Sequence, residues 1–331
     1  MVDKLLEIKN LSVKYHTDEA VVYAVNGIDL SLSKGETLGL VGETGAGKTT
    51  TALSILRLLP SKIGEISTGE VVFNGVNLLA LPMDRMRKIR GDQISMIFQD
   101  PMTSLNPVLT VGEQIAEVLD FHMYDEKKHA NKEAIDKRVD EILRLVGLQP
   151  ERKSEYPHQF SGGMKQRIVI AMALACEPML LIADEPTTAL DVTIQAQVLK
   201  MMRELKDKLN TSMILISHDL GVVAQNCDTT SIMYAGEIVE SGPVEELFDL
   251  KRQHHPYTTG LFGAIPDLSK PTKRLNPVAG LMPDPTHLPA GCKFHVRCPK
   301  CMDVCKTTAP EPHIDGNRTI RCHLFREGLY R

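Results

Sequence analysis

The chain lacks a long apolar run: none of its 331 residues lies in an uninterrupted hydrophobic stretch of about 18 or more, the length that a membrane-spanning helix requires. The sequence therefore predicts no transmembrane helix. Residues 1–7 also lack the apolar core of a signal peptide. Basic residues are not in excess, because 38 Lys and Arg stand against 42 Asp and Glu and give a formal net charge of −4. Nucleic-acid-binding proteins usually carry a basic footprint, so we expect a protein that does not bind nucleic acid. Because a transmembrane helix and a signal peptide are not predicted, we expect it to be cytoplasmic.

Internal repeats and low-complexity tracts are absent as well, and the composition is that of a globular protein, with 43% hydrophobic and 24% charged residues. At roughly 100–200 residues per domain, the length allows two domains. The character of the sequence changes after about residue 249, where prolines become dense. We therefore expect a first domain at 1–249 and a smaller, loop-rich C-terminal module at 250–331.

Hydrophobic periodicity predicts an α/β core. Apolar residues alternate over 28–32, as in a half-buried strand, and residues 70–75 end in the Asn-Gly pair that is typical of a hairpin. Spacings of three and four residues between 108 and 148 indicate helices, and Gly147 is suited to end one of them. The other expected strands are 6–13 (with an interruption), 37–41, 94–98, 179–183 and 212–217, and the other expected helices are 48–59, 161–175 and one from about 192. Because strand and helix alternate in the second half, we expect a parallel sheet.

A glycine-rich loop follows the apolar strand at 37–41. Residues 42–49 read Gly-Glu-Thr-Gly-Ala-Gly-Lys-Thr, which fits the pattern G-x-x-x-x-G-K-[ST] and opens a helix. The glycines let backbone N–H groups face phosphates, Lys48 is expected to reach the β- and γ-phosphates, and the Thr49 hydroxyl is expected to bind Mg²⁺. A glycine-rich turn without chemical meaning is the alternative, and the strand and helix on either side argue against it. The expected nucleotide contacts are Gly42, Glu43, Thr44, Gly45, Ala46, Gly47, Lys48, Thr49 and Thr50.

Two acids, Asp184 and Glu185, end the apolar run that begins at 179. Carboxylates at the end of a buried strand are costly unless they have partners. Asp184 is placed to hold Mg²⁺, and Glu185 is then the natural general base for the attacking water. The alternative is a solvated strand end, which the upstream phosphate loop makes a poor explanation.

Residues 161–167, Ser-Gly-Gly-Met-Lys-Gln-Arg, resemble the signature motif of ABC ATPases. The sequence departs from the commonest form of that motif at Phe160, usually leucine, and at Met164, usually glutamine. Ser161, Gly162 and Gly163 are retained. By this resemblance they contact the γ-phosphate of a nucleotide that is held by a second molecule.

Other positions match further landmarks of the same family. Gln99 resembles the Q-loop glutamine, which senses Mg²⁺, and residues 189–191 (Ala-Leu-Asp) resemble the D-loop. His218 is similar to the switch histidine that contacts the γ-phosphate, and Tyr15 resembles the aromatic that stacks on adenine. The resemblance implies catalytic roles for Glu185, His218 and Gln99, Mg²⁺ ligation by Thr49, Gln99 and Asp184, and nucleotide contacts by Tyr15 and Asp191.

The resemblance also implies a P-loop ABC-ATPase fold with an antiparallel β subdomain, a helical subdomain at about 100–176 and a small metal-binding extension. Three segments resemble oligopeptide and dipeptide importers: 99–107 (Gln-Asp-Pro-Met-Thr-Ser-Leu-Asn-Pro), 156–160 (Tyr-Pro-His-Gln-Phe) and 255–258 (His-Pro-Tyr-Thr). This implies an ATPase that drives uptake of dipeptides and oligopeptides, with nickel import as the alternative. A soluble ABC ATPase acting on nucleic acid or ribosomes usually fuses two cassettes or inserts long coiled coils, and neither is present.

The same resemblance implies partners and a location. The expected partners are two transmembrane permease subunits, an extracytoplasmic peptide-binding protein and a second, homologous but different ATPase subunit. A homodimer is the alternative for the last of these. The expected location is the cytoplasmic face of the cell membrane, as a peripheral subunit.

Five of the seven cysteines crowd into residues 292–322, and in a cytosolic protein such a cluster indicates metal more than disulfides. Zinc and an iron–sulfur cluster both suit thiolate ligands, and free thiols remain a third possibility. The resemblance implies a [4Fe–4S] cluster on Cys292, Cys298, Cys305 and Cys322, with Cys301 as an extra thiol. Cys176 and Cys227, in apolar segments, are expected to be inert core thiols.

Overall fold

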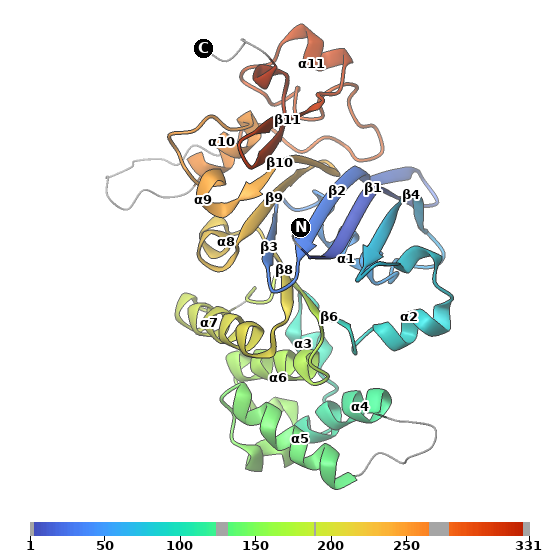
Figure 1. The fold of residues 1–331 in the computed structure, drawn as a ribbon, viewed down its shortest axis with the longest axis vertical. Coiled ribbons are helices and arrows are strands. Elements are labelled where there is room, and N and C mark those ends of the chain that lie inside the picture. The colour runs from blue at the N-terminus through green and yellow to red at the C-terminus, as the bar shows by residue number, and fades with distance from the viewer. Residues whose placement is uncertain (1–2, 124–131, 189, 265–277, 327–331) are drawn as a thin grey trace. The chain divides into compact units, whose positions relative to one another are not determined.

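The computed structural model describes residues 3–123, 132–188, 190–264 and 278–326, which are drawn as ribbon in Figure 1. The chain divides into two compact units. The first unit comprises Met1–Leu32, Thr37–Leu79 and Ile216–Arg331, and the second comprises Ser33–Glu36 and Ala80–Leu215. None of the described helices combines the length and the apolarity that crossing a membrane would need.

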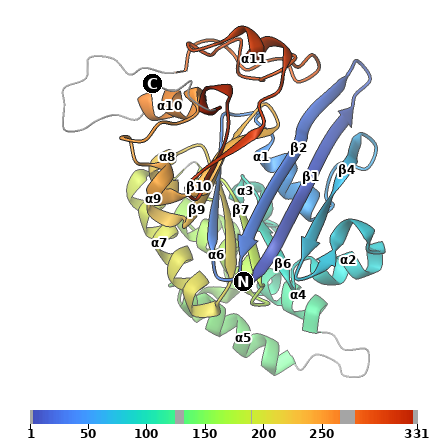
Figure 2. The ribbon, with the colours of Figure 1, turned by 45° about the horizontal axis from the view of Figure 1, so that its top comes forward.

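An antiparallel sheet in the order β2-β1-β4-β5 forms one layer of the first unit (Figure 2). The pairing of β1 with β4 shifts register between Lys9 and Ser12, where Asn10 has a φ of 46°. This bulge is the interruption that the sequence predicts. The Asn74-Gly75 hairpin is also confirmed, since both residues have positive φ and Phe73 pairs with Val76. The strands are β1 (Lys4–His16), β2 (Val21–Ser33), β4 (Gly64–Phe73) and β5 (Val76–Asn77).

A second run of strands in the first unit has the order β11-β12-β10-β9-β3. β3 is buried along its whole length and pairs in parallel with β9, whereas the other pairs are antiparallel. The strands are β3 (Thr37–Val41), β9 (Thr229–Tyr234), β10 (Glu237–Pro243), β11 (Pro312–Asp315) and β12 (Arg318–Arg321). The helices of this unit are α1 (Lys48–Ile55), α8 (Leu220–Asn226), α9 (Val244–Leu247), α10 (Pro256–Gly263) and α11 (Asp303–Thr307).

The second unit has strands in the order β8-β7-β6 with helices around them. β6 and β7 are parallel, as β3 and β9 are, so the predicted α/β core with parallel pairing is confirmed. The strands are β6 (Ile94–Ile97), β7 (Leu180–Asp184) and β8 (Ser212–Ser217). The helices are α2 (Met83–Ile89), α3 (Pro101–Ser104), α4 (Val111–Met123), α5 (Lys132–Leu145), α6 (Gly162–Leu174) and α7 (Val192–Leu209).

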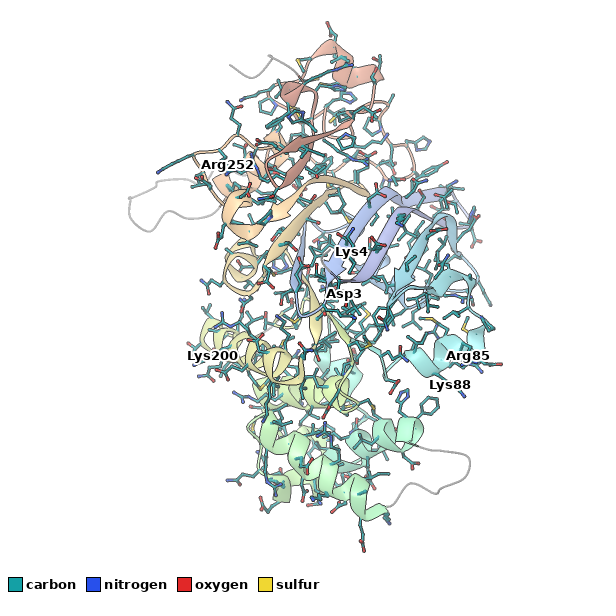
Figure 3. All side chains as sticks on the ribbon, in the orientation of Figure 1. Asp3, Lys4, Arg85, Lys88, Lys200 and Arg252 are labelled. Atoms are coloured by element: carbon teal, nitrogen blue, oxygen red, sulfur yellow. The ribbon has the colours of Figure 1, made fainter. Side chains whose placement is uncertain are left out.

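Helices α5 and α7 show why the periodic segments fold as they do. In α5, Ile135, Val139 and Ile142 recur at helical spacing and are buried. Gly147, with a φ of 74°, ends this helix as the sequence predicts, and Leu148 N–H donates to the Leu143 carbonyl at 2.8 Å. The exposed side chains in the C-terminal half of α7 are charged, and Lys200 lies 3.8 Å from Glu204 there (Figure 3).

Helix α1 ends at Ile55, so the prediction of a helix to about residue 59 is wrong. Arg57 adopts a φ of 52°, and the N–H groups of Arg57 and Leu58 donate to the carbonyls of Ser54 and Leu53. This hydrogen-bond pattern closes a helix with one left-handed residue, normally glycine. The apolar residues at 56, 58 and 59 extend the helical pattern in the sequence, and no glycine there indicates that the helix ends.

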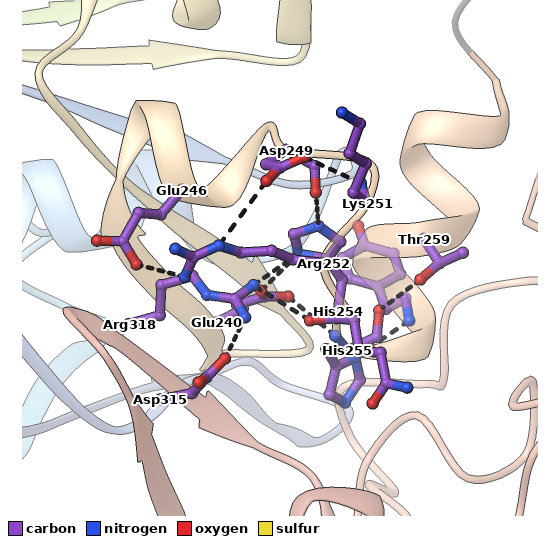
Figure 4. Close-up of polar contacts among 12 residues, drawn as sticks. Glu240, Glu246, Asp249, Lys251, Arg252, His254, His255, Thr259, Asp315 and Arg318 are labelled. Atoms are coloured by element: carbon purple, nitrogen blue, oxygen red, sulfur yellow. Dashed lines mark hydrogen bonds and ion pairs between the residues drawn. The ribbon is translucent and has the colours of Figure 1, made fainter. Parts of the chain in front are cut away.

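The C-terminal segment is more than the loop-rich appendage that its prolines predict, because β11 and β12 extend the run of strands beside β10. A buried ionic cluster holds this junction (Figure 4). Arg318 lies 3.2 Å from the Glu240 carboxylate, and His254 Nδ1 lies 2.9 Å from the same carboxylate. Arg318 also pairs with Asp315. Glu240 and Arg318 are 0% and 1% exposed, so the pair is desolvated and sensitive to loss of either partner.

Candidate nucleotide site

The glycine-rich loop joins β3 to α1 in the first unit, as predicted. Gly45 and Gly47 have φ values of 83° and 107°, which side chains rarely tolerate. A Cβ on Gly42 would lie 2.2 Å from the Met233 carbonyl oxygen, and a Cβ on Gly47 would lie 2.5 Å from the Ala24 carbonyl oxygen. Backbone conformation and close packing therefore both require glycine in this loop.

Lys48, the first residue of α1, is 6% exposed and folds back over the loop. Its Nζ donates to the carbonyls of Gly42 at 2.7 Å and Glu43 at 3.0 Å. Thr49, next to it, is exposed. A buried ammonium, a helix N-terminus and a tight curl of backbone form an anion-binding arrangement that suits phosphate.

Tyr15 reaches the same helix from β1. Its hydroxyl donates to Thr50 Oγ1 at 3.2 Å, which places the half-buried ring beside the first turn of α1. His218, also in the first unit, is exposed just after β8, and the following Asp219 accepts from the N–H groups of Gly221 and Val222 to begin α8. The structure thus brings Tyr15 to the phosphate loop and leaves His218 open to solvent.

Glu185 and Gln99 meet in the second unit, at the ends of the parallel pair β6 and β7. Gln99 Nε2 donates to Glu185 Oε2 at 3.2 Å, and the Thr188 hydroxyl donates to the same oxygen at 3.0 Å. Glu185 has a φ of 47°, a strained conformation for a non-glycine residue of the kind found at functional sites. Asp184, one residue earlier, is 2% exposed. Thr188 is a partner that the sequence reasoning missed, although its hydroxyl three residues after the acid is a usable signal.

Ser161 is the N-cap of α6, so the prediction that a helix begins here is confirmed. Its side chain is exposed and makes no capping hydrogen bond. A Cβ on Gly163 would lie 2.6 Å from Ile194 Cγ2, so this glycine lets α6 and α7 approach. Gly162, by contrast, is exposed, and a Cβ on it would lie 3.9 Å from Leu190 Cδ2, an ordinary contact distance.

The two departures from the common signature share one neighbour, Arg152. The Arg152 guanidinium lies 4.2 Å from the Phe160 ring centroid, and its Nη1 donates to Met164 Sδ at 3.5 Å. Glu155 holds the guanidinium from the other side at 2.6 Å. Phe160 and Met164 therefore form a single packing unit with Arg152, which the sequence reasoning did not foresee.

Asp191 is the N-cap of α7, and its side chain accepts from the Ile194 N–H at 2.9 Å. The residue is exposed, so it has both a local structural role and an open face. Ala189, which belongs to the predicted D-loop, lies outside the described residues.

Cys305 lies in helix α11, and the other four C-terminal cysteines lie outside the helices and strands. Burial raises the pKa of Cys292 to about 12 and of Cys322 to about 11, and each thiol also feels Cys298 and Cys305 nearby. Backbone N–H groups of Phe294, Lys300 and Leu324 face the sulfurs of Cys292, Cys298 and Cys322. Within the described ranges, no set of three or more His, Cys, Asp or Glu side chains is spaced to hold a metal ion as it stands. Burial likewise raises the pKa of Cys176 to about 11, as expected for an inert thiol.

The phosphate loop of the first unit, and within the second unit the strand-end glutamate held by a glutamine, each fit the class of ATP-hydrolysing P-loop proteins. Residues 25–188 match the family described as ABC transporter, and residues 239–305 match the oligopeptide/dipeptide transporter C-terminal region. The chain belongs to the ABC transporter family of ATP-binding proteins, in the group that carries this C-terminal region.

Relatives match over nearly the whole length. The chain is 49% identical to the oligopeptide transport ATP-binding protein AppD of Bacillus subtilis, covering 98% of this chain and 97% of AppD. It is 48% identical to the dipeptide transport ATP-binding protein DppD of Bacillus subtilis, covering 98% and 95%.

Solved structures agree on the fold of the cassette. The ATP-binding cassette MJ0796, a dimer bound to ADP and Pi, superimposes with a TM-score of 0.64 at 28% identity, covering 72% of this chain and 98% of that one. The protein cbiO1 from Clostridium perfringens, part of the transporter complex cbiONQ, gives 0.63 at 27% identity, covering 75% and 92%.

Proposed function

We propose that this chain energises the uptake of dipeptides and oligopeptides, as a peripheral subunit on the cytoplasmic face of the membrane. Its partners are two transmembrane permease subunits, an extracytoplasmic peptide-binding protein and a second, homologous ATPase subunit. One observation carries the proposal: the likeness to peptide-transport ATPases runs through the cassette and its C-terminal region alike, over 98% of the chain.

Two cassettes face head to tail in this proposal. The phosphate loop of one binds ATP, and Ser161, Gly162 and Gly163 of the other contact its γ-phosphate. The exposed Ser161 hydroxyl, which makes no capping bond, supports that role. Tyr15, beside the first turn of α1, stacks on adenine, and the open face of Asp191 meets the second cassette.

Glu185 accepts the proton of the attacking water, and the donor groups of Gln99 and Thr188 hold its carboxylate in place. His218, exposed beyond β8, donates to the γ-phosphate. Thr49, Gln99 and Asp184 supply the oxygen ligands that Mg²⁺ prefers, and the ion neutralises charge on the β- and γ-phosphates when bound. Loss of the γ-phosphate removes these contacts and lets the two cassettes separate.

The test is uptake in cells that lack the chain. Cells complemented with the wild-type chain are expected to accumulate a labelled tripeptide, and cells with Glu185→Gln are not. Accumulation of labelled nickel in place of peptide would replace this proposal with nickel import. If neither uptake depends on the chain, while ribosomes or nucleic acid stimulate its ATPase activity, the transport assignment fails.

We propose further that Cys292, Cys298, Cys305 and Cys322 hold a [4Fe–4S] cluster, with Cys301 as an extra thiol. Cys298 and Cys305 both influence Cys292 and Cys322 electrostatically, so the four thiols lie near one another, which supports a shared site. The raised pKa values of Cys292, Cys298 and Cys322 keep these thiols neutral when they are unligated, so the cluster must displace their protons on binding. Its role is structural, since it would staple loop-rich chain.

The cluster is tested on chain purified without oxygen. A broad visible absorption band, with iron and sulfide in about four equivalents each, supports it. A colourless chain with stoichiometric zinc assigns the site to zinc, and a metal-free chain leaves free thiols. Cys301→Ser is expected to keep the iron, whereas Cys305→Ser is expected to lose it.

A further inference from the structure

Glu43 is the first variable residue of the phosphate loop, and its N–H, its carbonyl and its carboxylate all form hydrogen bonds within the first unit. Its carbonyl accepts from Lys48 Nζ at 3.0 Å and from the Ala46 N–H at 3.1 Å. Its N–H donates to the Tyr257 hydroxyl at 3.0 Å. Its carboxylate accepts two hydrogen bonds from Arg297, at 3.0 and 3.2 Å. Two of these partners, Tyr257 and Arg297, belong to the C-terminal extension.

A carboxylate at this position is unfavourable for the site's own ligand. It adds negative charge to a loop whose purpose is to hold phosphate, and like charges repel. The bidentate pair with Arg297 offsets that charge, and the two side chains are 28% and 5% exposed, so solvent screens the pair only in part.

Arg297 is held in place by other residues of the extension and by Tyr234 of β9. Its Nε donates to the Ala279 carbonyl at 2.9 Å, and Nη2 donates to the Val278 carbonyl at 3.2 Å. The guanidinium carbon lies 5.7 Å and 6.0 Å from the ring centroids of Tyr234 and Phe294. Because the planar guanidinium uses these donors simultaneously, lysine cannot replace it.

Tyr257 shares this anchorage. It is 0% exposed, and its ring lies 4.6 Å from Tyr234 and 5.4 Å from Phe294, centroid to centroid. The extension thus presents two immobilised groups, a phenol and a guanidinium, to a single residue of the phosphate loop.

We propose that the C-terminal extension positions the phosphate loop for ATP through Glu43. Arg297 neutralises the Glu43 carboxylate, Tyr257 holds its backbone N–H, and the Glu43 carbonyl in turn holds Lys48 over the loop. Arg297 and Tyr257 are positioning residues, since neither touches the nucleotide in this arrangement. The inference rests on ATP binding at this loop and on no particular transport substrate.

The test measures nucleotide affinity of the full chain with a fluorescent ATP analogue, together with KM and kcat. Arg297→Ala is expected to raise Kd and KM about tenfold, with kcat changed less than about twofold, because the unpaired Glu43 charge opposes phosphate binding. Adding Glu43→Gln to this variant is expected to restore most of the affinity. Arg252→Ala is the control for loss of an ion pair away from the loop, because Arg252, which is 40% exposed, pairs with Glu246 at 2.7 Å.

An unchanged Kd in folded Arg297→Ala overturns the proposal, and so does a double variant that binds as weakly as the single one. If Arg297→Ala does not fold, Tyr257→Phe keeps the ring and removes only the acceptor oxygen. Hydrogen exchange at the Glu43 amide is then expected to accelerate. An unchanged exchange rate contradicts the proposal that Tyr257 holds this N–H. Failure of the wild-type chain to support peptide uptake, while it binds ATP normally, would instead count against the proposed transport function alone.

Discussion

Glu185 stands out at the scale of single residues because its backbone is strained while its carboxylate is held by two donors. We expect Glu185→Gln to lower steady-state ATP hydrolysis by about 10²- to 10⁴-fold, since an amide cannot accept the water's proton. ATP affinity is expected to stay within about twofold, because the amide keeps the shape of the side chain and most of its hydrogen bonds. Hydrolysis assays beside nucleotide titration check both. A variant that still hydrolyses at the wild-type rate would remove Glu185 from the role of base.

Arg152 links Phe160 and Met164, the two unusual residues beside the signature serine. A double-mutant cycle on Arg152→Ala and Phe160→Leu is expected to give a coupling of about 0.5–1 kcal/mol in unfolding free energy, from the stacked guanidinium. Chemical denaturation of the four proteins measures it. Additive effects would mean that the stacking contributes nothing to stability.

Asp191 belongs to the scale of elements, because it begins the 18-residue helix α7. Asp191→Ala is expected to lower the unfolding free energy by about 1 kcal/mol, and Asp191→Ser by less, since serine also caps helices. Thermal or chemical denaturation distinguishes them. If Asp191 also meets a second cassette, hydrolysis by the assembled transporter falls in both variants, whereas a purely local cap predicts a normal rate in Asp191→Ser.

The sequence predicted most elements of the cassette because their signals are local. The strand at 37–41, the hairpin turn at Asn74-Gly75 and the helix after Ser161 all follow from neighbouring residues. The end of α1 was wrong because Arg57 takes a left-handed conformation without glycine's usual signal. Strands β11 and β12 were missed because they are short and polar and depend on pairing with distant β10.

At the scale of the whole molecule, we expect the pH dependence of stability to depend on buried His255, the N-cap of α10. Burial lowers the pKa of His255 to about 4, so its ring stays neutral and accepts from the Tyr257 N–H at 3.1 Å. Below a pH of about 6.5, His255 binds a proton in the unfolded chain, whereas in the folded chain it does so only below a pH of about 4. The free energy of unfolding therefore rises with pH between these two values. We expect acidification across it to cost up to about 3 kcal/mol from this residue alone.

The measurement is the unfolding free energy at several pH values, for wild type and for His255→Asn. Asparagine can accept the same N–H but does not titrate, so its curve is expected to be flatter between about pH 6.5 and 4. Parallel curves would show that another group controls acid sensitivity.

The candidate site was predictable in part for the same reason of locality. The phosphate loop and the acids at 184–185 are recognisable as contiguous motifs. The Arg297–Glu43 pair joins residues 254 positions apart, and nothing beside either residue indicates the other. The hydrogen bond between Gln99 and Glu185 was predictable only in part. Family resemblance suggested the role of each residue, but their contact arises because β6 and β7 end side by side in a parallel pair.

The buried Glu240–Arg318 pair has an evolutionary consequence. Glu240 lies in strand β10, and its guanidinium partner comes from β12, near the end of the described chain. A substitution that removes the Arg318 guanidinium but keeps the surrounding chain would leave a buried acid without that neutralising partner, a change that usually destabilises by several kcal/mol. We therefore expect positions 240 and 318 to change together in evolution, with a neutral residue replacing the acid where the arginine is lost.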